Sequence, residues 1–155
     1  MLTLALVLLC QVAGSSDEGQ RTVTFLTEDA FLETLGLEGS HGLNLSLEVR
    51  TFQQTGLLLF HQLSSQGHVQ LSLSEGKLRA EVVVEGTAPR VLEHPATRLD
   101  DGEWHTVQFW VGRGKAVLVV GEARVGGRVG KVTTGSLYRV GGGLHGEQGL
   151  VGCLR

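Results

Sequence analysis

Several features that narrow the function of a protein are scarce in this chain. It has 2 prolines among 155 residues, and beyond its first residues no segment is apolar enough to span a bilayer as a helix. No segment shows sustained helical periodicity, which argues for a fold built from strands. The formal net charge of -3 is also too small to indicate nucleic acid or an acidic substrate as the partner.

Residue patterns that carry catalysis or bind metals are equally hard to find. The histidines are scattered and lack the spacing of zinc ligands. Asp100, Asp101 and His105 could form an acid and base pair, but no sequence signature supplies a nucleophile or an oxyanion site beside them. We therefore expect that the protein is not an enzyme and that it carries no resident cofactor.

What the chain does have is glycine, with 23 residues spread among short apolar runs. Residues 43–51, 69–74 and 78–84 alternate apolar and polar side chains, as half-buried antiparallel strands do. Residues 56–60 form a continuous apolar run that predicts a strand covered on both faces. The pattern predicts an all-β sandwich of ten or more short strands.

Turn signals separate these strands, although two segments are ambiguous. Glu75-Gly76 and Gly112-Arg113-Gly114-Lys115 predict tight hairpins. Residues 30–37 could form a strand or a short helix, and Pro95 is expected to end the extended segment 90–92.

The most specific stretch is residues 99–111, in which an Asp-Gly turn leads directly into an alternating strand. Val107 and Phe109 share one parity and are expected in the core. His105 has the same parity, so we expect it at the core edge with a backbone group as its partner.

The N-terminus has the pattern of a secretory signal peptide over residues 1–16. An apolar run over residues 2–10 precedes the small residues Ala13-Gly14-Ser15-Ser16, although no Lys or Arg precedes it. A buried strand or the remnant of a larger chain is the alternative. Cleavage would remove Cys10 and leave Cys153 alone, which indicates either a free thiol or a disulfide partner beyond the chain. Because the chain stops within a predicted strand, we favour the missing partner.

Charge is distributed unevenly, with acidic residues concentrated in 17–38 and basic residues in 113–139. The second region predicts a basic surface for polyanions such as sulfated glycans. The alternative is that these charges are solvated strand ends and loops. The candidate residues are Arg113, Lys115, Arg124, Arg128 and Lys131.

Asn44-Leu45-Ser46 is a sequon for N-glycosylation. The parity of the neighbouring leucines places Asn44 on the outward face, where a glycan is sterically feasible.

Taken in order, the motifs resemble those of a laminin G-like (LNS) domain. The most specific are Arg50-Thr51 followed by Gly56-Leu57-Leu58-Leu59, the turn Asp101-Gly102-Glu103-Trp104-His105, and the terminal Gly152-Cys153. The resemblance covers nearly all of residues 17–155. It implies a concanavalin-like jelly-roll β-sandwich of two antiparallel sheets that lacks its C-terminal end, so that the last strand would leave an unpaired edge.

The resemblance also implies an extracellular role. Family members stand in laminins, neurexins, agrin, perlecan, Crumbs-like and Fat-like mosaic proteins, often beside EGF modules, so the parent protein is expected to be secreted or membrane-anchored. Their partners are matrix proteins, cell-surface receptors and sulfated glycans such as heparan sulfate. The family pairs the cysteine of Gly-Cys with a later cysteine, which implies a partner for Cys153 beyond the chain.

Calcium is bound at the rim of the sandwich in some family members. Those members carry an acidic residue just before the strand that corresponds to residues 68–73. Here that place holds Gln66-Gly67, so a calcium ion would lack its main charged ligand. This departure argues against a calcium site.

The leading functional hypothesis is an extracellular binding module for adhesion, matrix attachment or receptor contact. The alternatives are a small-ligand carrier with a pocket between the sheets and a glycan-processing enzyme. The enzyme would require two carboxylates across a cleft, and acidic pairs on one strand face are absent.

Overall fold

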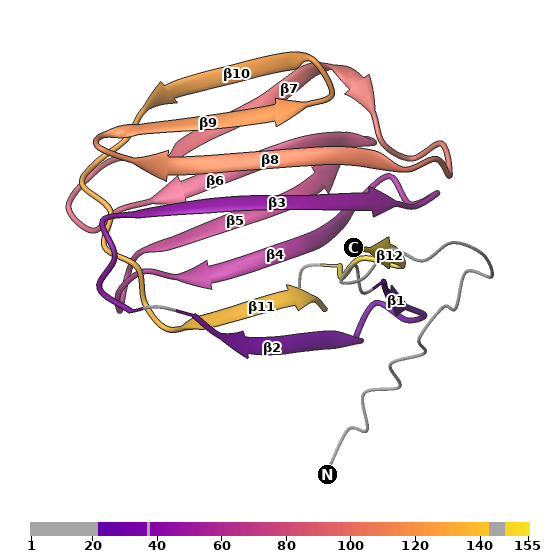
Figure 1. Ribbon diagram of the computed structural model, residues 1–155, viewed down its shortest axis with the longest axis horizontal. Helices are drawn as coiled ribbons and strands as arrows, with labels where there is room; N and C mark the ends of the chain where they lie inside the picture. The colour runs from indigo at the N-terminus through magenta and orange to yellow at the C-terminus, as the bar shows by residue number, and fades with distance from the viewer. Residues whose placement is uncertain (1–21, 37, 143–147) are drawn as a thin grey trace, which may run out of the picture.

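The computed structural model describes residues 22–36, 38–142 and 148–155, and within these ranges it consists of strands and turns without a helix. Two six-stranded sheets lie one behind the other (Figure 1). Sheet 1 has the order β1-β12-β3-β8-β9-β10, and sheet 2 has the order β2-β11-β4-β5-β6-β7. The strands are β1 (Val23–Phe25), β2 (Phe31–Leu35), β3 (Gly42–Arg50), β4 (Gly56–Gln62), β5 (His68–Ser74), β6 (Lys77–Val83), β7 (Arg90–Arg98), β8 (His105–Gly112), β9 (Lys115–Val120), β10 (Ala123–Arg128), β11 (Leu137–Gly141) and β12 (Gly152–Leu154).

All neighbouring strands in both sheets are antiparallel, as the sequence predicts. The predicted two-sheet sandwich of more than ten short strands is therefore confirmed. In the part of the chain that the structure describes, there is no helix of the length and apolarity needed to cross a membrane. The expected signal peptide at residues 1–16 lies outside the described residues.

The space between the sheets is filled by hydrophobic side chains from both of them. Alternate residues of β5 and β6 are fully buried, among them Leu71, Leu78 and Ala80 at 0% exposure. From sheet 1, Phe109 and Leu118 enter the same core. This filled interior counts against the carrier hypothesis, which requires an open cavity at that place.

Two-residue hairpin turns determine the register of the long strands. Glu75 and Gly76 join β5 to β6 with φ values of 52° and 78°, and Arg113 and Gly114 join β8 to β9 with 49° and 75°. Two successive residues with positive φ form the turn whose twist matches that of an antiparallel pair. Both predicted hairpins are confirmed, and the turns decide which residues stand opposite each other.

Pro95 does not end the extended segment as predicted, because β7 continues from Arg90 to Arg98. β7 is the edge strand of sheet 2, so one side of its backbone is not needed for pairing and proline is tolerated there. The pairing with β6 also shifts between Lys77 and Arg79, which leaves an irregular segment around the proline. Residues 30–37, which were ambiguous, contain the strand β2.

The apolar run in β4 is covered on both faces, as predicted. Leu57, Leu58 and Leu59 are at most 4% exposed, although a register shift between Leu57 and Leu59 interrupts the pairing with β5. Segment 148–150 lies alongside the start of β4, since the Leu57 amide donates to the carbonyl of Gln148 at 2.8 Å and the Leu150 amide donates to the carbonyl of Leu57 at 3.2 Å.

β12 is paired on both sides, contrary to the expectation of an unpaired last strand. Leu154 stands opposite Val23 of β1 and Val49 of β3. Within the described ranges the open flank lies on β3 instead, where residues 42–47 pair with β8 on one side and with no strand on the other. The backbone groups of that flank are available to another extended segment.

The Asp-Gly turn before β8 is held by its own side chain. Asp101 Oδ1 accepts hydrogen bonds from the Glu103 amide at 2.9 Å and from His105 Nε2 at 2.8 Å, and these two bonds lower the pKa of Asp101. The partner of His105 is thus a carboxylate and not the backbone group that we expected. Gly102 has a φ of 78°, and its amide donates to the carbonyl of Thr51.

His61 is buried in the core beside Tyr138. Its ring stacks on the Tyr138 ring with 3.8 Å between the centroids, and Nδ1 donates to the Leu137 carbonyl at 2.9 Å. Nε2 has no hydrogen-bond partner within the described structure. Burial lowers the pKa of His61, although the hydrogen bond to Leu137 opposes the shift.

Removing a side chain from the centre of the core tests the packing. Leu71→Ala would delete a side chain with 0% exposure, which costs about 2–5 kcal/mol of unfolding free energy when the cavity stays open. The control is Leu35→Ala, where the side chain is 77% exposed and a change within about 0.5 kcal/mol is expected. Urea titration measures both, and equal losses would contradict this packing.

Acid should destabilise the fold through His61. The unfolded histidine binds a proton near its ordinary pKa of about 6.5, whereas the native pKa is lower, so stability falls as the pH drops below that value. We expect the melting temperature of the parent chain to fall more between neutral pH and pH ~5 than that of His61→Phe, which keeps an aromatic ring against Tyr138. Parallel pH profiles for the two chains would rule out this role.

Candidate functional site

The five predicted basic residues all lie along the edge of sheet 1 that β9 and β10 form. Arg113 occupies the β8–β9 turn, Lys115 begins β9, Arg124 and Arg128 lie on β10, and Lys131 follows that strand. All five are exposed. We call this set the basic surface.

The strand register explains why three of these side chains share a face. Lys115 stands directly opposite Arg128, and Arg124 stands opposite Val119. The core residues of β9 have the other parity, so these side chains point away from the interior. Arg124 and Arg128 are four residues apart on one strand, which separates them by about 13 Å.

The β8–β9 turn brings the remaining two residues to the same edge. The Val129 amide donates to the Gly114 carbonyl at 3.0 Å, so the chain beyond β10 passes beside the turn that carries Arg113. Lys131 follows two residues later. The basic surface therefore joins residues that are up to 18 positions apart in the sequence.

A shallow hollow of about 280 Å³ lies within the basic surface. Lys115, Arg124 and Arg128 contribute to its lining, together with Gly126 and Gly127 of β10. Because glycines add no side chain, a ligand can approach the backbone between the two arginines.

No acidic partner in the described part of the chain neutralises the basic surface. The four ion pairs found there are Arg98–Asp100, His105–Asp101, Arg139–Glu33 and Arg155–Glu48, and none includes a residue of the set. Five uncompensated cations along one edge of a sheet produce a positive local potential even though the whole chain is slightly acidic.

Arg90 is a further cation that the sequence analysis missed. It begins β7 of sheet 2, and its guanidinium lies 2.6 Å from the place where a side-chain carbon on Gly127 would be. Arg90 thus contacts β10 at the edge of the sandwich where β7 of sheet 2 and β10 of sheet 1 lie close together. Arg90 lies 37 residues before Gly127, so the sequence does not indicate that the two are in contact. The contact forms only when the edges of the two sheets meet.

Asn44 is exposed on the outward face of β3, as its parity predicts, and stands opposite Trp110 of β8. The arrangement leaves room for a glycan, and its attachment stays a prediction.

Cys153 is a free, half-buried thiol in this structure. Its Sγ lies 3.3 Å from the hydroxyl of Thr24 on β1. A disulfide partner beyond the chain stays a prediction.

The turn between β4 and β5 carries Gln66, which is exposed. Among the described residues no group of three or more His, Cys, Asp or Glu side chains is placed to hold a metal ion. The sequence departure at Gln66 therefore has no acidic cluster beside it that could supply the missing ligands.

Comparison with known proteins agrees with the fold. Residues 49–155 match the family model of the laminin G domain. Neurexin-4 of Drosophila melanogaster is 31% identical over 134 residues, which cover 86% of this chain and 10% of that protein. Contactin-associated protein 1 of Homo sapiens is 35% identical over 119 residues, which cover 72% of this chain and 8% of that protein.

A solved structure shows the same architecture. Domains LG4-5 of the mouse laminin alpha1 chain superpose with a TM-score of 0.74 at 23% identity, over 94% of this chain and 43% of that one. The predicted jelly-roll sandwich is confirmed by this similarity. The chain spans about a tenth of the length of the curated relatives that it matches.

Proposed function

The chain belongs to the laminin G domain family, and from this premise we propose that it is an extracellular binding module that serves adhesion, matrix attachment or receptor contact. Its parent protein is secreted or membrane-anchored, and its contribution is recognition and not catalysis. The basic surface binds sulfated glycans of the heparan sulfate type. The observation that carries this proposal is the clustering of five exposed cations without acidic partners along one edge of sheet 1.

The geometry of the basic surface suits a linear polyanion. Arg124 and Arg128 project from one face of an edge strand, and Lys115 stands beside Arg128. A sulfated chain could lie across this row while its sulfate groups contact guanidinium and ammonium groups, which are good donors to such anions. The positive potential also accelerates encounter with a polyanion, an effect that salt weakens.

A protein partner is also supported by the relatives. One of them is named for its association with contactin, which favours a protein ligand for this chain as well. Binding sites on rigid β-scaffolds commonly lie on loops and edges. The open flank of β3 and the exposed Phe52, at 78% exposure, are places where a partner could add contacts.

The alternative functions find less support. A carrier requires space between the sheets, and that space is filled by the core. A glycan-processing enzyme requires two carboxylates facing each other across a cleft. A hollow of about 450 Å³ on the outer face of sheet 2 has Glu81 as the single carboxylate among its lining residues.

Salt elution from immobilised heparin tests the basic surface. Arg113→Ala combined with Arg128→Ala should elute at lower NaCl, and its affinity should fall roughly 2- to 30-fold, because each exposed charge contact contributes about 0.2–1 kcal/mol. The matched control is Lys77→Ala combined with Arg79→Ala, which removes two positive charges from the outer face of sheet 2. Unchanged elution of the double variant, or an equal effect in the control, would contradict the proposal.

Glycosylation of Asn44 is tested by secretion from a eukaryotic cell. We expect a glycan on this exposed asparagine, which would slow the chain in gel electrophoresis until a glycosidase removes it. Asn44→Gln should run at the position of the deglycosylated chain. Identical mobility with and without the glycosidase would show that the sequon is unused.

A further inference from the structure

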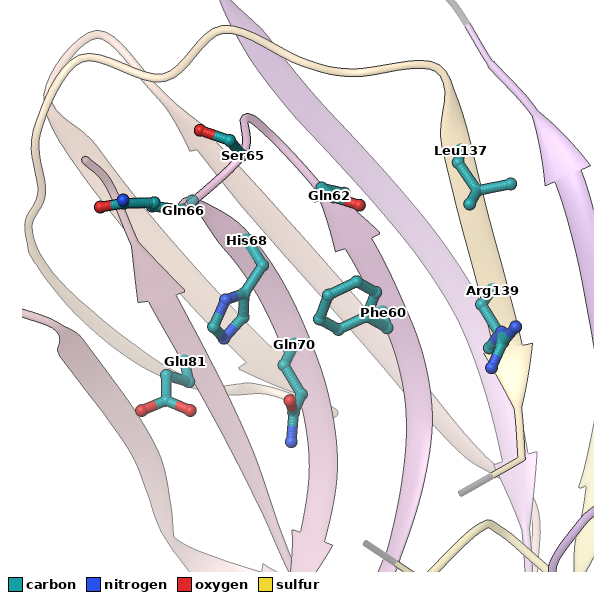
Figure 2. A pocket seen from close by; sticks show the side chains of 10 residues that line it. Phe60, Gln62, Ser65, Gln66, His68, Gln70, Glu81, Leu137 and Arg139 are labelled. Carbon is teal, nitrogen blue, oxygen red and sulfur yellow. The ribbon is translucent and has the colours of Figure 1, made fainter. Parts of the chain in front are cut away.

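We infer that the outer face of sheet 2 carries a second binding site, which recognises an uncharged saccharide of one or two pyranose rings. The site is a hollow of about 450 Å³ that faces away from the core (Figure 2). This volume lies in the range of about 300–1000 Å³ that small-molecule sites occupy. We call it the sheet 2 hollow; it is lined by Phe60, Gln62, Ser65, Gln66, Gly67, His68, Gln70, Glu81, Leu137 and Arg139.

The register of sheet 2 places the principal side chains in one row across four strands. Arg139 of β11 stands opposite Phe60 of β4, Phe60 opposite Gln70 of β5, and Gln70 opposite Glu81 of β6. With strands about 4.8 Å apart, the row spans roughly 14 Å between its outer backbones. A groove of this width accommodates a sugar ring lying across the strands.

Two aromatic rings form the floor at the middle of the row. The Phe60 and His68 rings are stacked with 5.3 Å between their centroids and 26° between their planes. Figure 2 shows them side by side, with Gln62 on one side and Gln70 on the other. Neither ring belongs to the core, so packing in the interior does not explain why aromatic side chains stand here. A flat apolar surface of this kind suits the C–H face of a pyranose.

Planar hydrogen-bonding groups surround these rings. The Gln62 amino group donates to the Ser64 carbonyl at 3.0 Å, which leaves its carbonyl oxygen as an acceptor, while Gln70 adds a second side-chain amide and Glu81 two acceptor oxygens. Hydroxyl groups of a sugar both donate and accept, so they pair with such a mixed set. An aromatic floor with amides and a carboxylate around it therefore matches a polyhydroxylated ring better than a purely apolar ligand.

The charges of the sheet 2 hollow argue against an anionic ligand. Arg139 is held by Glu33, with Nη2 donating to Oε1 at 2.6 Å, and its guanidinium lies over the Phe31 ring at 4.3 Å. The cation at this side is thus already compensated, whereas Glu81 has no ion pair in the described structure. A sulfated chain would meet the negative charge of Glu81, so this site differs in specificity from the basic surface.

Nuclear magnetic resonance titration of the 15N-labelled chain with lactose and with N,N′-diacetylchitobiose tests the inference. We expect millimolar binding of at least one disaccharide, with the largest shift changes at the side-chain amides of Gln62 and Gln70. Phe60→Ala should weaken that binding about tenfold or more. Gln70→Ala is a second variant, which leaves the aromatic floor in place and should weaken binding to a smaller degree.

Trp110→Ala is the matched control, because it removes an outward aromatic ring from sheet 1 and should leave saccharide binding unchanged. The absence of shift changes with both disaccharides at tens of millimolar would overturn the inference, as would equal binding by Phe60→Ala or equal loss in the control. Heparin elution of Phe60→Ala should match that of the parent chain. The saccharide site in the sheet 2 hollow and the proposed polyanion site can therefore be confirmed or refuted independently.

Two further probes identify the source of the saccharide. Lactosylceramide in phosphatidylcholine vesicles presents lactose from a lipid, and a desialylated glycoprotein presents a related terminal sugar from a protein. If the vesicles bind the parent chain but not Phe60→Ala, the site recognises a glycolipid. If the glycoprotein does so, the site recognises a protein-linked sugar. These probes apply when lactose is the disaccharide that binds, and in that case retention on neither would contradict recognition of a lactose-type sugar by this site.

Discussion

Successive side chains of a strand point to opposite faces, and every functional feature of this molecule depends on that constraint. In each long strand, every second residue is apolar and is buried in the core between the sheets, as in β5 and β9. Polar and aromatic residues of the other parity are therefore displayed on the two outer faces. The sandwich thus presents two separate surfaces, one basic and one aromatic with amides around it.

The pairing register of the strands decides which of these outward residues lie next to one another and form a site. The two-residue turn at Arg113-Gly114 places Lys115 beside the β10 arginines once β10 folds back, and the turn at Glu75-Gly76 places Gln70 opposite Glu81. A slip of one residue in either hairpin would move the whole set to the interior. The turns are therefore as important for recognition as the residues that contact a ligand.

A rigid sheet with independent surfaces is useful in a long mosaic chain. The curated relatives that this chain matches are about ten times its length, so a domain of this kind occupies a small part of those proteins. Weak sites on single domains gain strength when several engage together. A modest polyanion site and a modest saccharide site are consistent with such a setting.

The sequence by itself determined the class of fold, since alternation, glycine turns and the ordered motifs indicate a laminin G sandwich without any contact information. It also predicted a basic surface at Arg113, Lys115, Arg124, Arg128 and Lys131 from the uneven distribution of charge, although it gave no strand parity for these residues. Only the tertiary structure decided that Arg90 packs against β10 at Gly127, on the face opposite to the basic side chains, and that Arg139, Phe60, Gln70 and Glu81 form one row. Those residues are separated by up to 79 positions and each is ordinary in its local pattern. Long-range strand pairing brings them together, and pairing partners are set by the packing of the whole sandwich and not by any one segment.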